Sequence, residues 1–282
     1  MDWLPGPFGD YAFMERALIA GLLAVVTTSV IGTWVVIRGM TFIGDALAHG
    51  VLPGISLAFI WGVDVRLGAL ASAVVMVAGI GLVHRRARLP EDTGIGLLFV
   101  GMLALGVIII SRQRSYAGDL SSFLFGDILG VTDGDVRALL VAALGVTALV
   151  AVSYRAFLAL SFNPEKASSL GLHPRAAHAL MLALIAVSIV ASFQAVGTLL
   201  VFGLLVAPPA TASLLVRRVP HVMLTGVLVG SVAVVGGLLI SFHHDTAASA
   251  TVSFTAVAIF FVVLAGRELV AVVRPARPVA EV

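Results

Sequence analysis

Residues 17–37 read ALIAGLLAVVTTSVIGTWVVI, a run without a charged side chain, and this run decides the class of the fold. A helix of about 20 apolar residues spans the hydrocarbon core of a bilayer, and the run has that length. The apolar stretch Ala176–Val216 is too long for one span and is interrupted near Gln194–Gly197, so it predicts two helices. Further runs of spanning length lie at about Ala46–Val63, Leu67–Val83, Thr93–Ser111, Ala138–Tyr154, Val222–Phe242 and Thr246–Gly266. The sequence therefore predicts an all-α polytopic membrane protein with about nine (eight to ten) transmembrane helices.

The composition supports a membrane protein. Hydrophobic residues make up 60% of the chain, charged residues 11%, and the mean hydropathy is +1.12, whereas soluble domains are about half apolar and about a quarter charged. The net charge of +2 is too small to indicate a nucleic-acid partner. The N-terminus is acidic before Arg16 and lacks a basic segment, so the first apolar run is expected to be retained as a helix and not removed as a signal peptide.

The positions of the basic residues predict the orientation, because cytoplasmic loops carry an excess of Lys and Arg. Nine crossings with the basic loops inside place the N-terminus outside and the C-terminus in the cytoplasm. Arg112, Arg114 and Arg137 are exceptions, since they fall in a connection that this count makes external. The loops placed inside contain Arg85, Arg86 and Arg88; Arg155, Lys166 and Arg175; Arg217 and Arg218; and Arg274 and Arg277.

Asp45 and His49 are ionisable residues at the start of an apolar run. Their spacing of four residues places both side chains on one face of a helix. An ionisable residue within a membrane segment is costly and indicates a pathway or a ligand site. Without cysteine in the chain, a metal must be held by groups such as imidazole and carboxylate. The orientation count places the pair near the inner end of its helix, although a pathway site is expected deeper.

Two segments are too polar or too short to cross the membrane. An external segment at about residues 116–130 is expected to be re-entrant or interfacial. Asp127 within it is a candidate for gating or for contact with a binding protein, with helix capping as the alternative. A capped helix is predicted at about residues 161–172, since Asn163 precedes Pro164 and Gly171 gives a stop.

Prolines and a polar cluster mark three further positions. Pro53 lies four residues beyond His49, and Pro208 with Pro209 interrupts a second span. Interrupted helices are tolerated where they line a cavity or pack inside the protein, so the paired prolines are gating candidates, and a simple kink is the alternative for Pro53. His243, His244 and Asp245 form a secondary metal-binding candidate at the outer end of a span, with a solvated turn as the alternative.

Several motifs together resemble one family. They are Arg38–His49, Leu124–Leu129, Asn163–Ala167 with Gly171, Val196–Leu200 and Leu204–Ala212. In this order and spacing they are similar to the membrane permease subunit of a bacterial ABC importer for divalent metals, the zinc, manganese and iron family. The chain departs from that family after Asp245, where Thr246–Ala250 replaces the usual Pro and Gly.

The resemblance implies a single transmembrane permease domain over residues 1–282 with the ABC importer permease fold. It implies a homodimer in the bacterial inner membrane on two cytoplasmic ATP-binding subunits, supplied by an extracytoplasmic metal-binding protein. The helix at 161–172 would be the coupling helix that docks on the ATPase, through Asn163, Pro164, Glu165, Lys166, Ala167 and Gly171. The chain has no phosphate-binding loop, so ATP is expected on the partner and no cofactor is expected to be bound permanently.

Asp45 and His49 supply two ligands per chain, whereas a zinc site commonly has four, or three with water. We expect two protomers to combine both pairs into one transient site for Zn²⁺, Mn²⁺ or Fe²⁺; the alternative is that the two side chains bond only each other and nearby backbone. A secondary metal transporter driven by an ion gradient is the alternative function. No His-Glu-x-x-His motif is present, and the chain is not expected to be an enzyme by itself.

Overall fold

The computed structural model describes residues 8–9, 11–86, 91–111, 128–162 and 173–273, and these ranges are helical apart from short turns. They contain nine candidate membrane spans, which confirms the predicted all-α polytopic fold. One span, Phe42–Trp61, is built from two consecutive helices. The helices are α2 (Ala12–Ile37), α3 (Phe42–Gly50), α4 (Leu52–Trp61), α5 (Val65–Arg86), α6 (Glu91–Ile110), α8 (Asp133–Phe162), α10 (Pro174–Val196), α11 (Thr198–Leu215), α12 (Val219–His244) and α13 (Ala248–Val273), with a short 3-10 helix, η1 (Ile128–Gly130).

Gly197 separates α10 from α11 and is the only residue between them. Its φ of 84° and ψ of 157° lie in a region that residues with a side chain rarely adopt. No loop separates the two helices, because the Gly197 N–H still bonds the Phe193 carbonyl of α10 at 2.8 Å and the Gly197 carbonyl accepts from the Val201 N–H of α11 at 3.1 Å. The predicted division of the long apolar stretch is confirmed.

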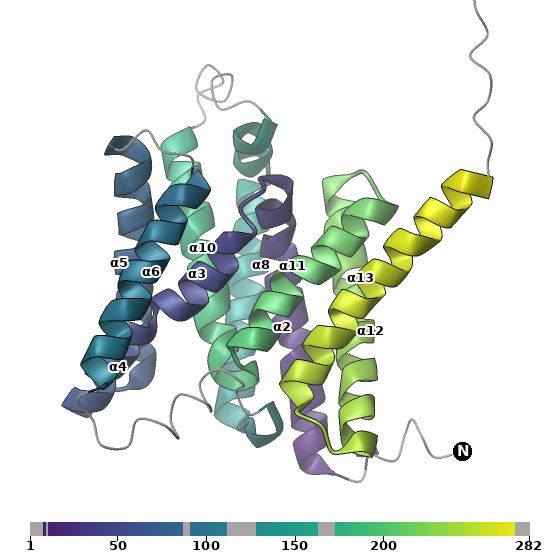
Figure 1. The fold of residues 1–282 in the computed structure, drawn as a ribbon, viewed down its shortest axis with the longest axis horizontal. Helices are drawn as coiled ribbons and strands as arrows, with labels where there is room; N and C mark the ends of the chain where they lie inside the picture. The colour runs from purple at the N-terminus through teal and green to yellow at the C-terminus, as the bar shows by residue number, and fades with distance from the viewer. Residues whose placement is uncertain (1–7, 10, 87–90, 112–127, 163–172, 274–282) are drawn as a thin grey trace, which may run out of the picture.

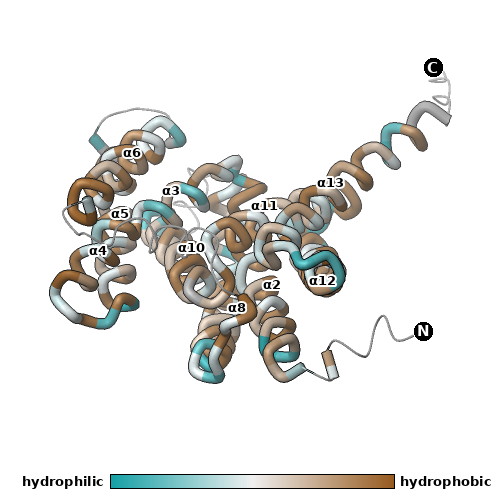
Figure 2. Tube along the Cα trace, turned by 60° about the horizontal axis from the view of Figure 1, so that its bottom comes forward, coloured by the Kyte–Doolittle hydropathy of each residue, from teal (hydrophilic) through white to brown (hydrophobic). Residues whose placement is uncertain are grey.

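Helix α2 lies at the centre of the bundle, where it contacts α8, α10, α11 and α12. In its most apolar window 72% of the residues are buried, compared with 17% for α6 at the edge. Figure 2 shows apolar tube along most of the helices, with polar segments mainly near helix ends. The apolar surfaces of the outer helices are thus suited to contact with lipid.

Successive spans alternate in direction, so the loops fall into two groups at opposite ends of the molecule. In Figure 1 α2 starts at the bottom and α13 ends at the top. We call the upper end the arginine end, because it carries the basic residues Arg38, Arg86, Arg175, Arg217 and Arg218.

Basic residues also occur at the opposite end, and two of them, Arg66 and Arg16, lie against acids. Arg66 at the start of α5 donates from Nη2 to Asp135 of α8, and Arg16 Nε of α2 lies 3.6 Å from an Asp133 oxygen. These ion pairs reduce the net positive charge at that end. The arginine end carries the basic loops that the sequence analysis placed together, and its assignment to the cytoplasmic side stays a prediction.

Candidate functional site

Helix α3 carries Asp45 in its first turn and His49 in its last turn. A tight turn connects it to α2, with the Met40 N–H bonded to the Val35 carbonyl at 3.0 Å. The first turn of a helix favours a carboxylate, because the N-terminal end of the helix dipole is positive. The turn therefore places Asp45 near the arginine end.

His49 lies deeper in the bundle than Asp45. At a rise of about 1.5 Å per residue it is about 6 Å further along the helix axis, and about 10 Å from Phe42. Since α3 runs obliquely inward from the end of α2 (Figure 1), the pair extends from the arginine end towards the interior. Asp45 thus lies near the end of the bundle, as the loop assignment predicts, and His49 lies deeper, as is expected of a residue on a transport pathway.

The two side chains face each other without a tight hydrogen bond. His49 Nε2 lies 3.4 Å from Asp45 Oδ1, and the side chains are 20% and 32% exposed, respectively. Hydrogen bonds in proteins are usually shorter than about 3.2 Å. Both groups keep open surface, so the pair can turn a nitrogen and carboxylate oxygens towards an ion. This combination of donors suits Mn²⁺, Fe²⁺ or Zn²⁺.

One chain supplies only part of a coordination shell. Within the ranges that the structure describes, no group of three or more His, Cys, Asp or Glu side chains could hold a metal ion. Asp45 and His49 thus form a pair and not part of a larger cluster within the described ranges, and their role as metal ligands stays a prediction. A fuller shell needs water or ligands from another molecule.

An aromatic ring from α6 borders the pair. The ring centroid of Phe99 lies 6.0 Å from that of His49, with the planes inclined by 57°, and 5.5 Å from that of Phe42. An apolar wall next to a ligand limits access of water and holds the orientation of an imidazole. Phe99 was not found by sequence reasoning, because one Phe in an apolar span carries no signal of its contacts.

The other side of α3 packs closely on α11. A Cβ built on Gly44 would lie 2.6 Å from a methyl group of Leu205 and 3.2 Å from the ring of Phe202. The residue that precedes Asp45 must therefore be small for this packing. Helix α3 is held between α6 and α11, and the orientation of its ligand face is fixed by both.

The span is interrupted at Val51, between α3 and α4. Pro53 has no N–H to donate to the carbonyl of His49. The hydroxyl of Ser72 on α5 donates to the neighbouring carbonyl of Gly50 at 2.9 Å, in a buried position. A side chain of a neighbouring helix thus satisfies backbone that the interruption exposes, and Ser72 is a second residue that the sequence analysis did not identify.

Pro208 and Pro209 lie inside α11 and are buried. They face α12, where Cβ atoms built on Gly230 and Gly226 would lie 3.4 and 3.6 Å from Pro208 and Pro209, respectively. The prolines therefore have a packing contact with two glycines. Their predicted part in gating stays a prediction.

The cluster His243–Asp245 lies at the end of α12 opposite the arginine end, and its side chains are exposed. His243 Nδ1 is 2.8 Å from the Leu239 carbonyl, and Asp245 adopts a left-handed backbone with φ 50°. The cluster does not combine with other acids or histidines of the described chain into a metal-binding group. Its role as a secondary metal site stays a prediction.

Other predicted functional residues lie outside the described ranges. They are Asp127 in the external segment, and Asn163, Pro164, Glu165, Lys166, Ala167 and Gly171 in the predicted coupling helix.

Comparison with known proteins places the chain among transport permeases. Residues 10–267 match the family described as "ABC 3 transport family". The chain is 35% identical over 253 residues to the manganese transport system membrane protein MntC of Listeria innocua, covering 90% of each chain. It is 38% identical over 258 residues to the chelated iron transport system membrane protein YfeD of Yersinia pestis, covering 91% of this chain and 86% of that protein.

A solved structure has the same arrangement of helices. The structure described as PsaBC from Streptococcus pneumoniae in complex with Fab has a TM-score of 0.82 to this chain at 30% sequence identity. The match covers 93% of this chain and 94% of the other. With a family match over nearly the whole chain and relatives of this similarity, the chain belongs to the ABC 3 transport family.

Proposed function

We propose that this chain is the membrane permease of an ATP-driven importer that carries a divalent metal ion, Mn²⁺ or Fe²⁺, into a bacterial cell. The observation that carries the proposal is the Asp45–His49 pair, two partly open ligands on an inclined helix inside a bundle of membrane spans. Two relatives of the chain bear the names of manganese and chelated iron transport systems. Oxygen and imidazole nitrogen without sulfur are ligands that suit both ions.

The transient metal site takes its ligands from two copies of the chain. Each copy contributes Asp45 and His49, and a twofold axis along the pathway brings the two pairs together. The 3.4 Å separation within the pair favours a site that releases its ion, since neither ligand is locked by a short hydrogen bond. A set of two carboxylates and two imidazoles binds the ion during passage from one side to the other.

Energy comes from a separate ATPase. The chain contains no phosphate-binding loop, so two ATP-binding subunits are its partners at the arginine end. Residues 163–172 act as the coupling helix there, between α8 and α10. An extracytoplasmic metal-binding protein delivers the ion at the other end, which places the N-terminus outside and the C-terminus in the cytoplasm.

Uptake by the reconstituted complex tests the proposal. Permease, ATPase and binding protein are assembled in proteoliposomes, and uptake of radioactive Mn²⁺ is measured with ATP. Asp45→Asn and His49→Gln are each expected to lower uptake at least about tenfold while assembly with the ATPase is unchanged. The matched controls Asp133→Asn and His221→Gln change exposed residues on α8 and α12 and are expected to keep uptake.

Two results would contradict the proposal. Normal uptake in both ligand variants would exclude the pair as the metal site. Uptake that continues without the ATPase and follows an imposed ion gradient would identify a secondary transporter instead.

A further inference from the structure

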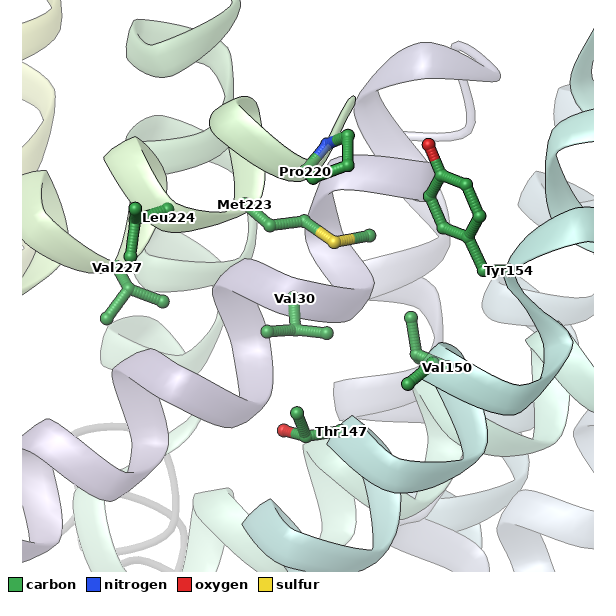
Figure 3. A pocket seen from close by; sticks show the side chains of 9 residues that line it. Val30, Thr147, Val150, Tyr154, Pro220, Met223, Leu224 and Val227 are labelled. Carbon is green, nitrogen blue, oxygen red and sulfur yellow. The ribbon is translucent and has the colours of Figure 1, made fainter. Parts of the chain in front are cut away.

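An apolar cavity of about 480 Å³ lies between α2, α8 and α12. Val30 of α2, Val150 and Tyr154 of α8, and Met223 and Val227 of α12 form most of its wall. Figure 3 shows Met223 extending from α12 towards α8, with Val30 between the two helices. The volume is within the range of about 300–1,000 Å³ typical of small-molecule sites.

The cavity opens on the outside of the bundle. Figure 2 shows α3 and α6 on one side and α8 and α2 on the other. Leu224 on the cavity wall is 62% exposed, and Val152 beside the wall on α8 is 84% exposed. All three helices of the wall are membrane spans, so the medium at the opening is the acyl-chain region of the bilayer.

One end of the cavity is polar and basic. Figure 3 shows the Tyr154 hydroxyl directed towards the level of Pro220, the residue that begins the wall on α12. Arg155 follows Tyr154, and Arg217 with Arg218 precedes Pro220 by two or three residues. All three arginines are exposed, and within the described ranges none of them forms an ion pair with an acid.

We propose that this cavity binds an anionic phospholipid, with an acyl chain along Val30, Val150 and Val227 and the phosphate near Arg155, Arg217 and Arg218. Basic clusters between membrane helices attract acidic headgroups, by about fivefold in affinity for each Lys or Arg near the surface. Along the membrane normal, the apolar wall lies at the level of the acyl chains, and the arginines lie nearer the surface, at the level of the headgroup. A zwitterionic lipid such as phosphatidylcholine would satisfy the wall, but the charge of its phosphate is already balanced by its own choline group, so it offers the arginines no net negative charge.

The position of the cavity separates it from the proposed metal site. A second copy that completes the Asp45–His49 site approaches α3, whereas the cavity is lined by residues of α2, α8 and α12, and Figure 2 shows these helices apart from α3. Lipid binding there does not depend on the identity of the transported ion. The test can therefore use the assembled complex without metal.

Trp34 provides an intrinsic reporter for the site. It is completely buried, and its ring centroid lies 5.7 Å from that of Tyr154 in an edge-on contact. The variant Trp3→Phe/Trp61→Phe leaves Trp34 as the only tryptophan of the chain. The complex is placed in nanodiscs of phosphatidylcholine with a small fraction of phosphatidylglycerol brominated on the acyl chain near the headgroup, because bromine quenches indole fluorescence at short range.

Brominated phosphatidylglycerol is expected to quench Trp34 at least about fivefold more effectively than brominated phosphatidylcholine at the same mole fraction. The double variant Val150→Phe/Val227→Phe fills the cavity and is expected to remove this difference in quenching. The triple variant Arg155→Gln/Arg217→Gln/Arg218→Gln removes the basic rim and is expected to have the same effect. The controls Val152→Phe and Arg86→Gln change an exposed apolar residue on α8 and an exposed arginine on α5, and they are expected to keep it. Native mass spectrometry of the purified complex is expected to show retained anionic lipid only in the variants that keep the quenching.

Equal quenching by the two lipids, or a preference that survives in the arginine variant, would overturn the proposal. A second copy on this face would overturn it as well. The chain has no cysteine, so Leu224→Cys tests that case, and a disulfide-linked permease dimer in the membrane would assign the face to protein.

Discussion

The carbonyl oxygen of Leu205 in α11 lies against the α-carbon of Gly32 in α2, and a Cβ at position 32 would overlap it. Pro209 is the residue whose N–H would otherwise bond this carbonyl within α11, and proline has none. A Cα–H group is a weak donor that can approach such a carbonyl closely. Pro209 leaves the Leu205 carbonyl without its helical donor, and Gly32 has room for that carbonyl because it has no side chain. The two residues therefore act together, although they lie in helices far apart in the sequence.

Gly32→Ala is expected to lower the free energy of unfolding by about 1–3 kcal/mol, because backbone on both sides of the contact must move to admit a methyl group. Thermal unfolding of the purified protein in detergent measures the effect. Gly145→Ala on α8 is the matched control, since nothing lies within 4 Å of a Cβ built there. An unchanged melting temperature for Gly32→Ala would show that α2 and α11 are not in backbone contact.

Ser72→Ala is expected to cost about 1–3 kcal/mol, because the Gly50 carbonyl loses its donor in a buried position. Ser213→Ala serves as the control, as its exposed hydroxyl bonds the Ala210 carbonyl of its own helix, and we expect a change below about 0.5 kcal/mol. Thermal unfolding distinguishes the two variants. Equal stability of both would mean that the α3–α4 junction does not need the hydroxyl.

Phe99→Ala is expected to lower metal uptake about three- to tenfold by releasing the ring of His49, with little change in the amount of folded complex. Phe99→Tyr keeps the ring and is expected to keep uptake. The measurement is initial uptake against Mn²⁺ concentration in proteoliposomes. Full activity of Phe99→Ala would show that the 6.0 Å contact has no part in positioning the imidazole.

Asp135→Ala is expected to destabilise the protein more than Arg66→Ala does. Removal of Arg66 breaks its ion pair with Asp135, in which the Arg66 side chain is 48% exposed, and such a pair is worth up to about 1 kcal/mol. Asp135 also accepts hydrogen bonds from the N–H and hydroxyl of Thr132, at 3.1 and 2.6 Å, and so caps the start of α8. Thermal unfolding of the two single variants and the double variant separates these contributions; equal losses in the single variants would contradict the capping role.

The spans could be predicted from the sequence because length and hydropathy are local properties. The residues at which helices begin and end were harder to predict from the sequence. The predicted span Ala138–Tyr154 lies inside the longer helix α8, since a helix continues past the membrane wherever its ends are capped, and the Thr132–Asp135 pattern gives the signal that was missed.

The arrangement of the helices could not be derived in the same way. Helix α2 has no one-sided hydrophobic pattern, so hydrophobic periodicity does not show whether it is a central or a lipid-facing helix. Asp45 and His49 were found because charge is rare in such segments. Phe99, Ser72 and the contact of Gly32 with Leu205 involve ordinary residues of these segments, and only the fold gives them their partners.

Helices α10 and α11 are joined by Gly197 alone, so no flexible loop lies between them. Helix α11 carries Leu205, which touches both Gly32 and Gly44 beside the proposed metal ligands. Helix α10 returns to the arginine end and begins at Pro174, two residues beyond segment 163–172. Because a single residue joins α10 to α11, a shift of α11 beside the proposed metal ligands is expected to move α10 as well, and so to reach the end where the ATPase is proposed to bind.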